Sequence, residues 1–136
     1  MDLEILKIAS NTENNKSLTN YTHSSKLKNA LCGDEMQISL KIKKNIISDF
    51  GYQSKSCIYC QASASLLARK SINKSINSII NLIETADIIF ENNNLNFSKE
   101  WRDFNKLFNK KNMPRKECLK LPFKTLSKAL KEYYEK

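Results

Sequence analysis

The sequence has no long apolar run, and it begins without the features of a secretory leader. No stretch approaches the roughly 20 consecutive apolar residues that a membrane-spanning helix requires, so we expect neither a membrane protein nor a membrane partner. Residues 1–10 lack a basic segment followed by an apolar one. We therefore expect a cytoplasmic protein.

Arginine is scarce although the chain is strongly basic. The formal net charge is +9, but only Arg69, Arg102 and Arg115 carry the guanidinium groups that usually contact bases and phosphates in pairs of hydrogen bonds. The lysines are spread along the whole chain, without a cluster of basic and aromatic residues. Together with the scarcity of glycine and proline, this composition indicates a solvated lysine-rich surface. We expect no nucleic-acid partner, whereas an acidic protein partner is compatible with the charge.

Cysteine is sparse as well, but all four cysteines lie in three short segments that suit metal binding. These segments are Cys32-Gly33-Asp34, Cys57-Ile58-Tyr59-Cys60 and Arg115-Lys116-Glu117-Cys118. In a reducing compartment cysteines bind metals or perform redox chemistry more often than they form disulfides, although disulfide pairs in a secreted protein are an alternative. Three thiols and one carboxylate are the right number and type of ligand for a tetrahedral zinc or iron site.

Each of these residues also has a simpler explanation. An alternative for Cys60 is a small buried apolar residue, and an alternative for Asp34 is the cap of a turn. The spacing of Cys57 and Cys60 at the start of a helix resembles a thioredoxin-type redox pair, although the Trp-Cys-Gly-Pro type of surroundings is absent. Gly33 allows a tight turn, so the side chains of residues 32 and 34 can face one ion.

An antiparallel hairpin is predicted in the first half of the chain. Apolar and polar residues alternate over 36–43, and residues 46–52 are suited to a returning strand. Lys44-Asn45 is expected to form the turn, because Asn tolerates positive φ. Gly51 is expected to mark a bulge or bend near the end of the second strand.

Helical spacing dominates the rest of the sequence, apart from a polar segment over 11–22 that we expect to be a mobile loop. Helices are predicted over 3–8 and 58–70, and another is capped by Ser75 and ends at Asn92–Asn94. A further helix is capped by Ser98, and the last is opened by Pro122. Cys118 would then lie in the loop before the last helix. The pattern predicts one α+β domain over residues 1–136, with residues 1–20 partly flexible.

Several of these motifs together resemble the SufU/IscU family of iron–sulfur cluster assembly proteins, which are NifU N-terminal-like. The resemblance covers about residues 21–130 and includes the hairpin. Its three motifs are Leu31-Cys32-Gly33-Asp34-Glu35, then Ser56-Cys57 with Gln61-Ala62-Ser63-Ala64-Ser65, and Arg115-x-x-Cys118-x-x-Leu121-Pro122-Phe123-x-x-Leu126. It implies a SufE/NifU-like fold, in which an antiparallel sheet of about three strands packs against helices.

The SufU branch of the family is the more similar one. The long step from Cys57 to Cys118 leaves room for the inserted segment around Trp101 that SufU-type members have. The position of Arg115, three residues before the last cysteine, is also similar to that of an arginine in SufU-type proteins. Glu117 stands where IscU-type proteins have a histidine.

The resemblance implies a role for each residue of the site. Cys32, Asp34, Cys57 and Cys118 would be the metal ligands, with zinc as the metal, and Cys32 would accept sulfur. Arg115 would support work with a SufS-type cysteine desulfurase. The chain would then be no stand-alone enzyme but an acceptor and carrier of persulfide sulfur, which it passes to a downstream scaffold or to apo-proteins.

Two other functions use the same ligands. A scaffold would assemble a transient [2Fe–2S] cluster on them, and oxygen ligation by Asp34 would make that cluster labile. A structural zinc-binding module would instead use the metal for folding and bind another macromolecule. No role is assigned to Cys60, where the family usually has serine, and it is open whether this thiol is a spare ligand, a resolving thiol or inert.

Overall fold

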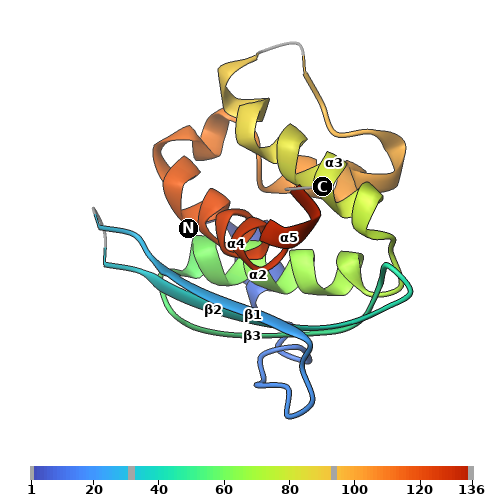
Figure 1. Cartoon of the computed structure of the whole chain (residues 1–136). Helices are drawn as coiled ribbons and strands as arrows, with labels where there is room; N and C mark the ends of the chain where they lie inside the picture. Colours follow the sequence, from blue (N-terminus) through green and yellow to red (C-terminus); the bar gives the residue numbers. More distant parts are fainter. Residues whose placement is uncertain (1, 31–32, 93–94, 135–136) are drawn as a thin grey trace.

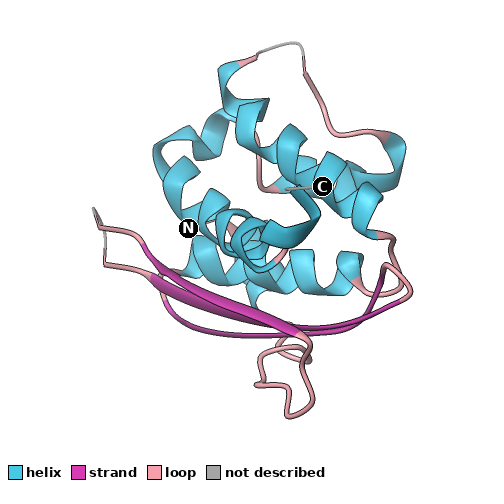
Figure 2. Cartoon of the chain, viewed as in Figure 1, coloured by secondary structure: helices cyan, strands magenta, loops and turns pink. Residues whose placement is uncertain are grey.

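A three-stranded antiparallel sheet is covered on one face by helices in the computed structural model, which describes residues 2–30, 33–92 and 95–134 (Figures 1 and 2). The strands β1 (His23–Lys28), β2 (Glu35–Lys43) and β3 (Ile46–Lys55) lie side by side in chain order. Helices α2 (Ile58–Ser71) and α4 (Lys116–Ala129) pack on the sheet, and α3 (Ile76–Ile88) packs on α4. This is the predicted α+β architecture.

Shorter helical elements complete the described chain. Helix α1 (Leu3–Ala9) packs against α2, and α5 (Lys131–Tyr134) follows α4. Three 3-10 helices, η1 (Ile89–Glu91), η2 (Lys99–Lys106) and η3 (Lys110–Arg115), connect α3 to α4. Among the described segments, no helix has both the length and the apolar character that crossing a bilayer requires.

The hairpin of β2 and β3 is confirmed at its turn. Lys44 and Asn45 have φ angles of 52° and 61°, the left-handed pair that a two-residue hairpin turn with the right twist requires. Met36, Ile38 and Leu40 alternate along β2 and are each 0% exposed, so the predicted apolar face is the one that the helices cover. The strand β1 pairs with β2, and its own sequence carries no strand pattern that would predict it.

The prediction that Gly51 marks a bulge is wrong. The register shift between β2 and β3 lies at Lys41 and Ile42, whereas Gly51 pairs regularly with Ser39. A Cβ atom at position 51 would lie 2.5 Å from the carbonyl oxygen of Lys16. The glycine is therefore explained by close packing of the 11–22 segment on the outer face of the sheet, which Figure 1 shows below the strands.

The first three predicted helices are confirmed. Helices form over Leu3–Ala9 and Ile58–Ser71, and Ser75 caps α3 by accepting a hydrogen bond from the backbone N–H of Ser78 at 3.2 Å. Asn92 follows η1, which continues directly from α3, and the other two residues of the predicted break lie outside the described residues.

In the second half, one prediction is right in part and another is wrong. Ser98 is the N-cap residue of η2, but its side chain makes no capping hydrogen bond, and the helix is a 3-10 helix in which Trp101 has a φ of −112°. The last long helix begins at Lys116 rather than at Pro122, which lies inside it. Pro122 cannot donate the helical hydrogen bond to the carbonyl of Cys118, but burial of the apolar face of α4 outweighs this local loss.

An aromatic cluster joins η2 and the segment after it to α4. Phe104 is 0% exposed and lies with its ring centroid 5.6 Å from those of Phe97 and Phe123. Phe108 also packs edge-on against Phe123, at 5.2 Å. The 3-10 segments are thus held by the same helix that carries Cys118.

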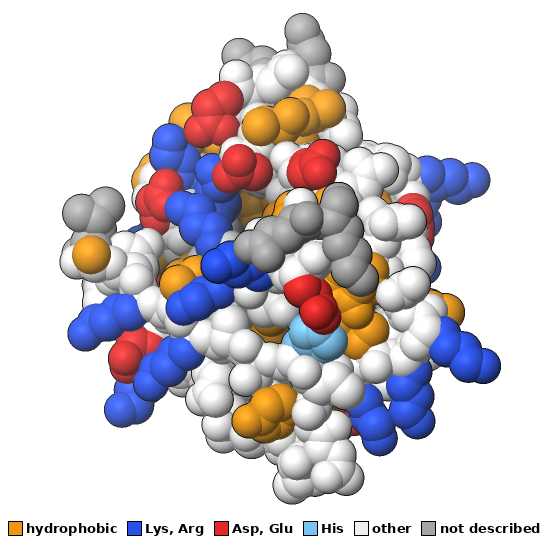
Figure 3. Space-filling view, viewed as in Figure 1, with side chains coloured by type: hydrophobic (Ala, Val, Ile, Leu, Met, Phe, Trp, Pro, Cys, Tyr) orange, Lys and Arg blue, Asp and Glu red, His pale blue; other side chains and the backbone are white. Residues whose placement is uncertain are grey.

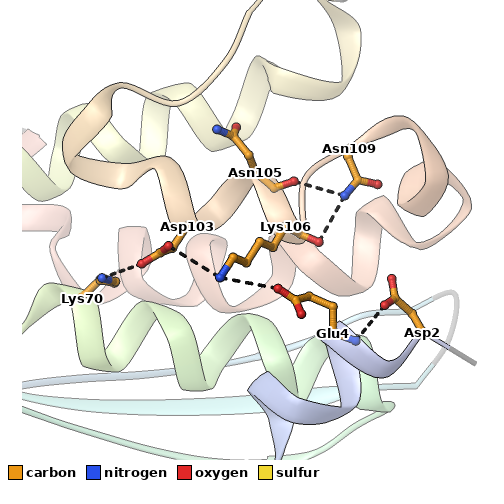
Figure 4. A network of polar contacts seen from close by, with 7 residues as sticks. All are labelled: Asp2, Glu4, Lys70, Asp103, Asn105, Lys106 and Asn109. Carbon is orange, nitrogen blue, oxygen red and sulfur yellow. Dashed lines mark hydrogen bonds and ion pairs between the residues drawn. The ribbon is translucent and has the colours of Figure 1, made fainter.

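Ion pairs connect the N-terminal helix α1 to the 3-10 helix η2 (Figure 4). Lys106 Nζ lies 3.5 Å from a carboxylate oxygen of Glu4 in α1 and 3.9 Å from one of Asp103. Asp103 also accepts from Lys70 of α2 at 2.7 Å, and this hydrogen bond lowers the pKa of the Asp103 carboxyl. Three elements that are distant in sequence therefore meet at one charged network on the surface.

Lysines and carboxylates are intermixed on the face that carries α3 and α4 (Figure 3). Lys116 and Lys120 of α4 lie 3.7 Å and 3.5 Å from Glu91 and Asp87 respectively. Much of the positive charge on this face is therefore balanced locally by acidic side chains of the α3–η1 segment.

Candidate metal centre

Cys57 lies at the start of α2, directly after the sheet. It is the N-cap residue of that helix, with φ −70° and ψ 167°, and its side chain makes no capping hydrogen bond. The thiol is partly exposed. Its backbone N–H donates to Oδ2 of Asp34 at 3.4 Å, so the loop before β2 is in contact with the start of α2.

Asp34 is positioned by a tight loop between β1 and β2. The backbone N–H of Gly33 donates to the carbonyl of Asn29, and the N–H of Asn29 donates to the carbonyl of Asp34, each at 2.8 Å. Gly33 has a φ of +77°, which confirms that the glycine serves a tight turn here. The Asp34 side chain is buried. Cys32, the fourth predicted ligand, lies outside the described residues.

Cys118 lies in the first turn of α4, not in a loop as predicted. It is the third residue of that helix and is 7% exposed. The hydroxyl of Ser63 in α2 donates to the carbonyl of Leu119 at 2.6 Å, which fixes the start of α4 against α2. Cys118 therefore enters the site from a regular element that is anchored to the helix carrying Cys57.

The structure brings together three of the predicted ligands. One ligand atom from each of Asp34, Cys57 and Cys118 lies within 4.8 Å of the other two. Two of these residues are at the N-terminal ends of 14-residue helices, where the partial positive charge of the helix dipole favours anionic groups. Two thiols and a carboxylate suit zinc or iron, and a closed tetrahedral site needs one more ligand.

Arg115 stands three residues before Cys118 in the chain. It is exposed, it ends η3, and its guanidinium carbon lies 5.3 Å from the ring centroid of Tyr59 in the first turn of α2. Stacking on an aromatic ring restrains the guanidinium while leaving its N–H groups available. No sequence signal points to Tyr59 as part of the site, because no spacing rule links it to Arg115, which lies far along the chain.

Cys60 lies outside the group formed by Asp34, Cys57 and Cys118. It is 0% exposed and belongs to the apolar core, although it is in the same turn of α2 as Tyr59. Cys57 is thus in the group of three candidate ligands, whereas Cys60 is in the apolar core.

Comparisons with known proteins point to one family. Residues 2–136 match the NifU-like N-terminal domain. The chain is 34% identical over 106 residues to the iron–sulfur cluster assembly scaffold protein IscU of Thermotoga maritima, a match that covers 77% of this chain and 74% of that protein.

Solved structures show the same fold. A NifU-like protein (N-terminal) from Brucella abortus superimposes with a TM-score of 0.89 at 21% identity, over 99% of this chain and 94% of that one. FiSufU from Fervidobacterium islandicum AW-1, described as a candidate iron–sulfur cluster assembly scaffold protein for the SUF system, superimposes with a TM-score of 0.86. The identity is 23%, and 96% of each chain is covered.

Proposed function

This chain belongs to the family of NifU-like N-terminal domains, and on that premise we propose that it takes part in iron–sulfur cluster assembly as a scaffold. The observation that carries the proposal is the convergence of Asp34, Cys57 and Cys118 within 4.8 Å. The similarity to the Thermotoga maritima scaffold protein supports it. Iron and sulfide would be the substrates, held by these three residues and by Cys32.

The ligand set accounts for both retention and release of such a cargo. Thiolates are soft ligands that suit iron–sulfur clusters, whereas a carboxylate is a harder and less well matched ligand. Asp34 would therefore be the weakest attachment point. Its loop is held by backbone hydrogen bonds rather than by a helix, so Asp34 can move away without unfolding a helix.

We propose, as the second candidate, that the same residues bind zinc and that the chain accepts persulfide sulfur from a cysteine desulfurase. Two features that resemble the SufU branch favour this candidate. Glu117 stands where IscU-type proteins have a histidine, and the chain has the inserted segment around Trp101. Bound zinc would keep the thiols deprotonated and shield them from oxidation. Cys32 would receive the sulfur, and the exposed Arg115 would contact the partner enzyme.

Anaerobic reconstitution with ferrous iron and sulfide tests the scaffold proposal. The wild-type protein and Cys60→Ser are expected to gain visible absorbance and to transfer a cluster to an apo-ferredoxin. Cys57→Ser is expected to lose both properties, because it removes one thiolate from the group. A wild-type protein that gains no colour would contradict the scaffold proposal.

The carrier candidate makes a different prediction in the same set of preparations. The protein purified in air would contain one equivalent of zinc and would stimulate sulfide release from cysteine by the desulfurase. Cys32→Ala would retain the fold and lose that stimulation. Equal stimulation by Cys32→Ala and wild type would eliminate this candidate.

A further inference from the structure

Cys57 and Cys60 occupy two special positions of α2. Cys57 is the N-cap residue, and Cys60 is therefore the third residue of the helix. These are the two positions of a capping box, in which the N-cap side chain reaches toward the third residue and the side chain of the third residue reaches back. In this chain both positions carry a thiol, and the Cys57 side chain makes no capping hydrogen bond.

The two thiols differ sharply in exposure. Cys57 is partly exposed, whereas Cys60 is 0% exposed. A reagent from solution would therefore meet Cys57, whereas burial shields Cys60 from it. This is the arrangement of an attacking thiol with a resolving thiol beside it.

The backbone of α2 permits a disulfide between these residues. Side chains three residues apart on a helix have Cβ atoms about 5–6 Å apart, and a disulfide needs about 3.5–4.5 Å. The difference can be closed at Cys57, whose ψ of 167° is already non-helical. The first N–H groups of a helix have no intrahelical acceptors, so a small shift there breaks few hydrogen bonds.

We propose that Cys57 and Cys60 form a thiol–disulfide exchange site whose substrates are low-molecular-weight disulfides. The thiolate of Cys57 attacks one sulfur of the small disulfide, breaks its S–S bond and releases one small thiol. The thiolate of Cys60 then attacks the Cys57 sulfur of the mixed disulfide and releases the second small thiol. Two protein thiols are oxidised, one disulfide is reduced to two thiols, and the two protons of the cysteines pass to those products.

The exchange would regulate the metal centre, and this consequence rests on the proposed function. An intramolecular disulfide removes Cys57 from the group that it forms with Asp34 and Cys118. A metal or cluster bound there would lose a thiolate ligand and dissociate more readily. Conversely, a bound metal would occupy Cys57 and protect the pair from oxidation.

Cys118 is the competing partner for Cys57. Its sulfur is within 4.8 Å of the Cys57 sulfur, but it lies on another helix. The hydrogen bond from Ser63 to Leu119 holds that helix against α2, so shortening the gap to the S–S bond of about 2.0 Å would require the two helices to shift. The pair within one helical turn needs only a local change.

Peptide mapping after oxidation tests the proposal. The metal-free full-length protein is incubated with excess oxidised glutathione, quenched in acid, alkylated with iodoacetamide and digested with trypsin. Peptide 56–69 contains both Cys57 and Cys60, whereas Cys118 falls in peptide 117–120 and Cys32 in peptide 29–41. We expect most of peptide 56–69 to be unalkylated and lighter by two hydrogen atoms.

Two outcomes would overturn the proposal. One is a stable glutathione adduct on Cys57 with Cys60 still alkylated, and the other is a cross-link of peptide 56–69 to peptide 117–120 or 29–41. In Cys60→Ser the internal disulfide must vanish and the glutathione adduct must accumulate. The conservative serine keeps the size of the side chain, and circular dichroism before oxidation checks its fold.

A second readout separates the exchange site from the proposed function. Wild-type protein carrying the internal disulfide is freed of glutathione, and its zinc affinity is measured with a chromogenic chelator before and after the disulfide is reduced. Weaker zinc binding before reduction supports regulation of the metal centre. Equal zinc affinity in the two states contradicts the regulatory consequence alone. A protein that binds no zinc yet forms the disulfide contradicts the proposed zinc site and leaves the exchange site standing.

Discussion

Replacing Cys118 by alanine is expected to weaken zinc binding by on the order of 100-fold or more. Loss of a residue that merely supports a ligand typically costs about 10- to 100-fold in metal affinity, and loss of a ligand itself costs at least as much. Cys118 contributes one of the thiols that converge with Asp34 and Cys57. Competition with a chelator of known affinity measures the change.

Cys60→Ala is the matched control for this substitution. Both cysteines are the third residue of a 14-residue helix, both are buried, and the same atoms are removed. The control is expected to bind zinc as wild type does, because Cys60 is not in the group of three. Equal affinity of wild type and Cys118→Ala, or an equal loss in both variants, would contradict the assignment of Cys118 as a ligand.

Phe104→Ala is expected to destabilise the protein by about 3–5 kcal/mol, the usual range for removing a buried phenylalanine. Its ring is 0% exposed and packs against Phe97, Trp101 and Phe123, so alanine would leave a cavity between η2 and α4. Urea unfolding of the metal-free protein measures the loss without a contribution from metal binding.

Tyr21→Ala provides the comparison for this change. Tyr21 is 53% exposed, and it is also an aromatic residue truncated to alanine. We expect its effect to stay within about 0.5 kcal/mol, as for most surface substitutions. Similar losses in the two variants would show that the aromatic cluster does not carry the attachment of η2 to α4.

The elements with strong local signals were predictable from the sequence. The alternation along β2, the Lys44-Asn45 turn and the Ser75 cap each depend on neighbouring residues, and each is present in the structure. β1 was missed because most of its side chains are polar and only Leu27 is a large apolar residue. An edge strand of this kind is specified by its partner β2 rather than by its own pattern.

The errors in the second half have a tertiary origin. A proline such as Pro122 is typical of the first residue of a helix. Here the helix begins at Lys116 and continues past Pro122, because its packing against α2 and the sheet stabilises it. The aromatic residues at 97, 101, 104 and 108 have a spacing that suits an α-helix, yet only residues 99–106 of this segment form the 3-10 helix η2. The rings of Phe104 and Phe108 pack against Phe123 of α4. No local rule contains that packing.

The candidate ligand residues could be named from the sequence, but their surroundings could not. Thiols and a carboxylate are identifiable by residue type, and the structure brings Asp34, Cys57 and Cys118 together. The stacking of Arg115 on Tyr59 depends on how α2 and α4 are placed against each other. The difference in exposure between Cys57, which is partly exposed, and Cys60, which is fully buried, also depends on this packing.

X-ray absorption at the zinc edge of the zinc-loaded protein tests the central claim most directly, namely that thiols from three distant segments share one metal ion with Asp34. The account predicts a shell of three sulfur atoms at about 2.3 Å and one oxygen at about 2.0–2.2 Å. It also predicts that the sulfur count falls by one in Cys118→Ser. A shell of oxygen and nitrogen alone, or a sulfur count that is the same in both proteins, would contradict it.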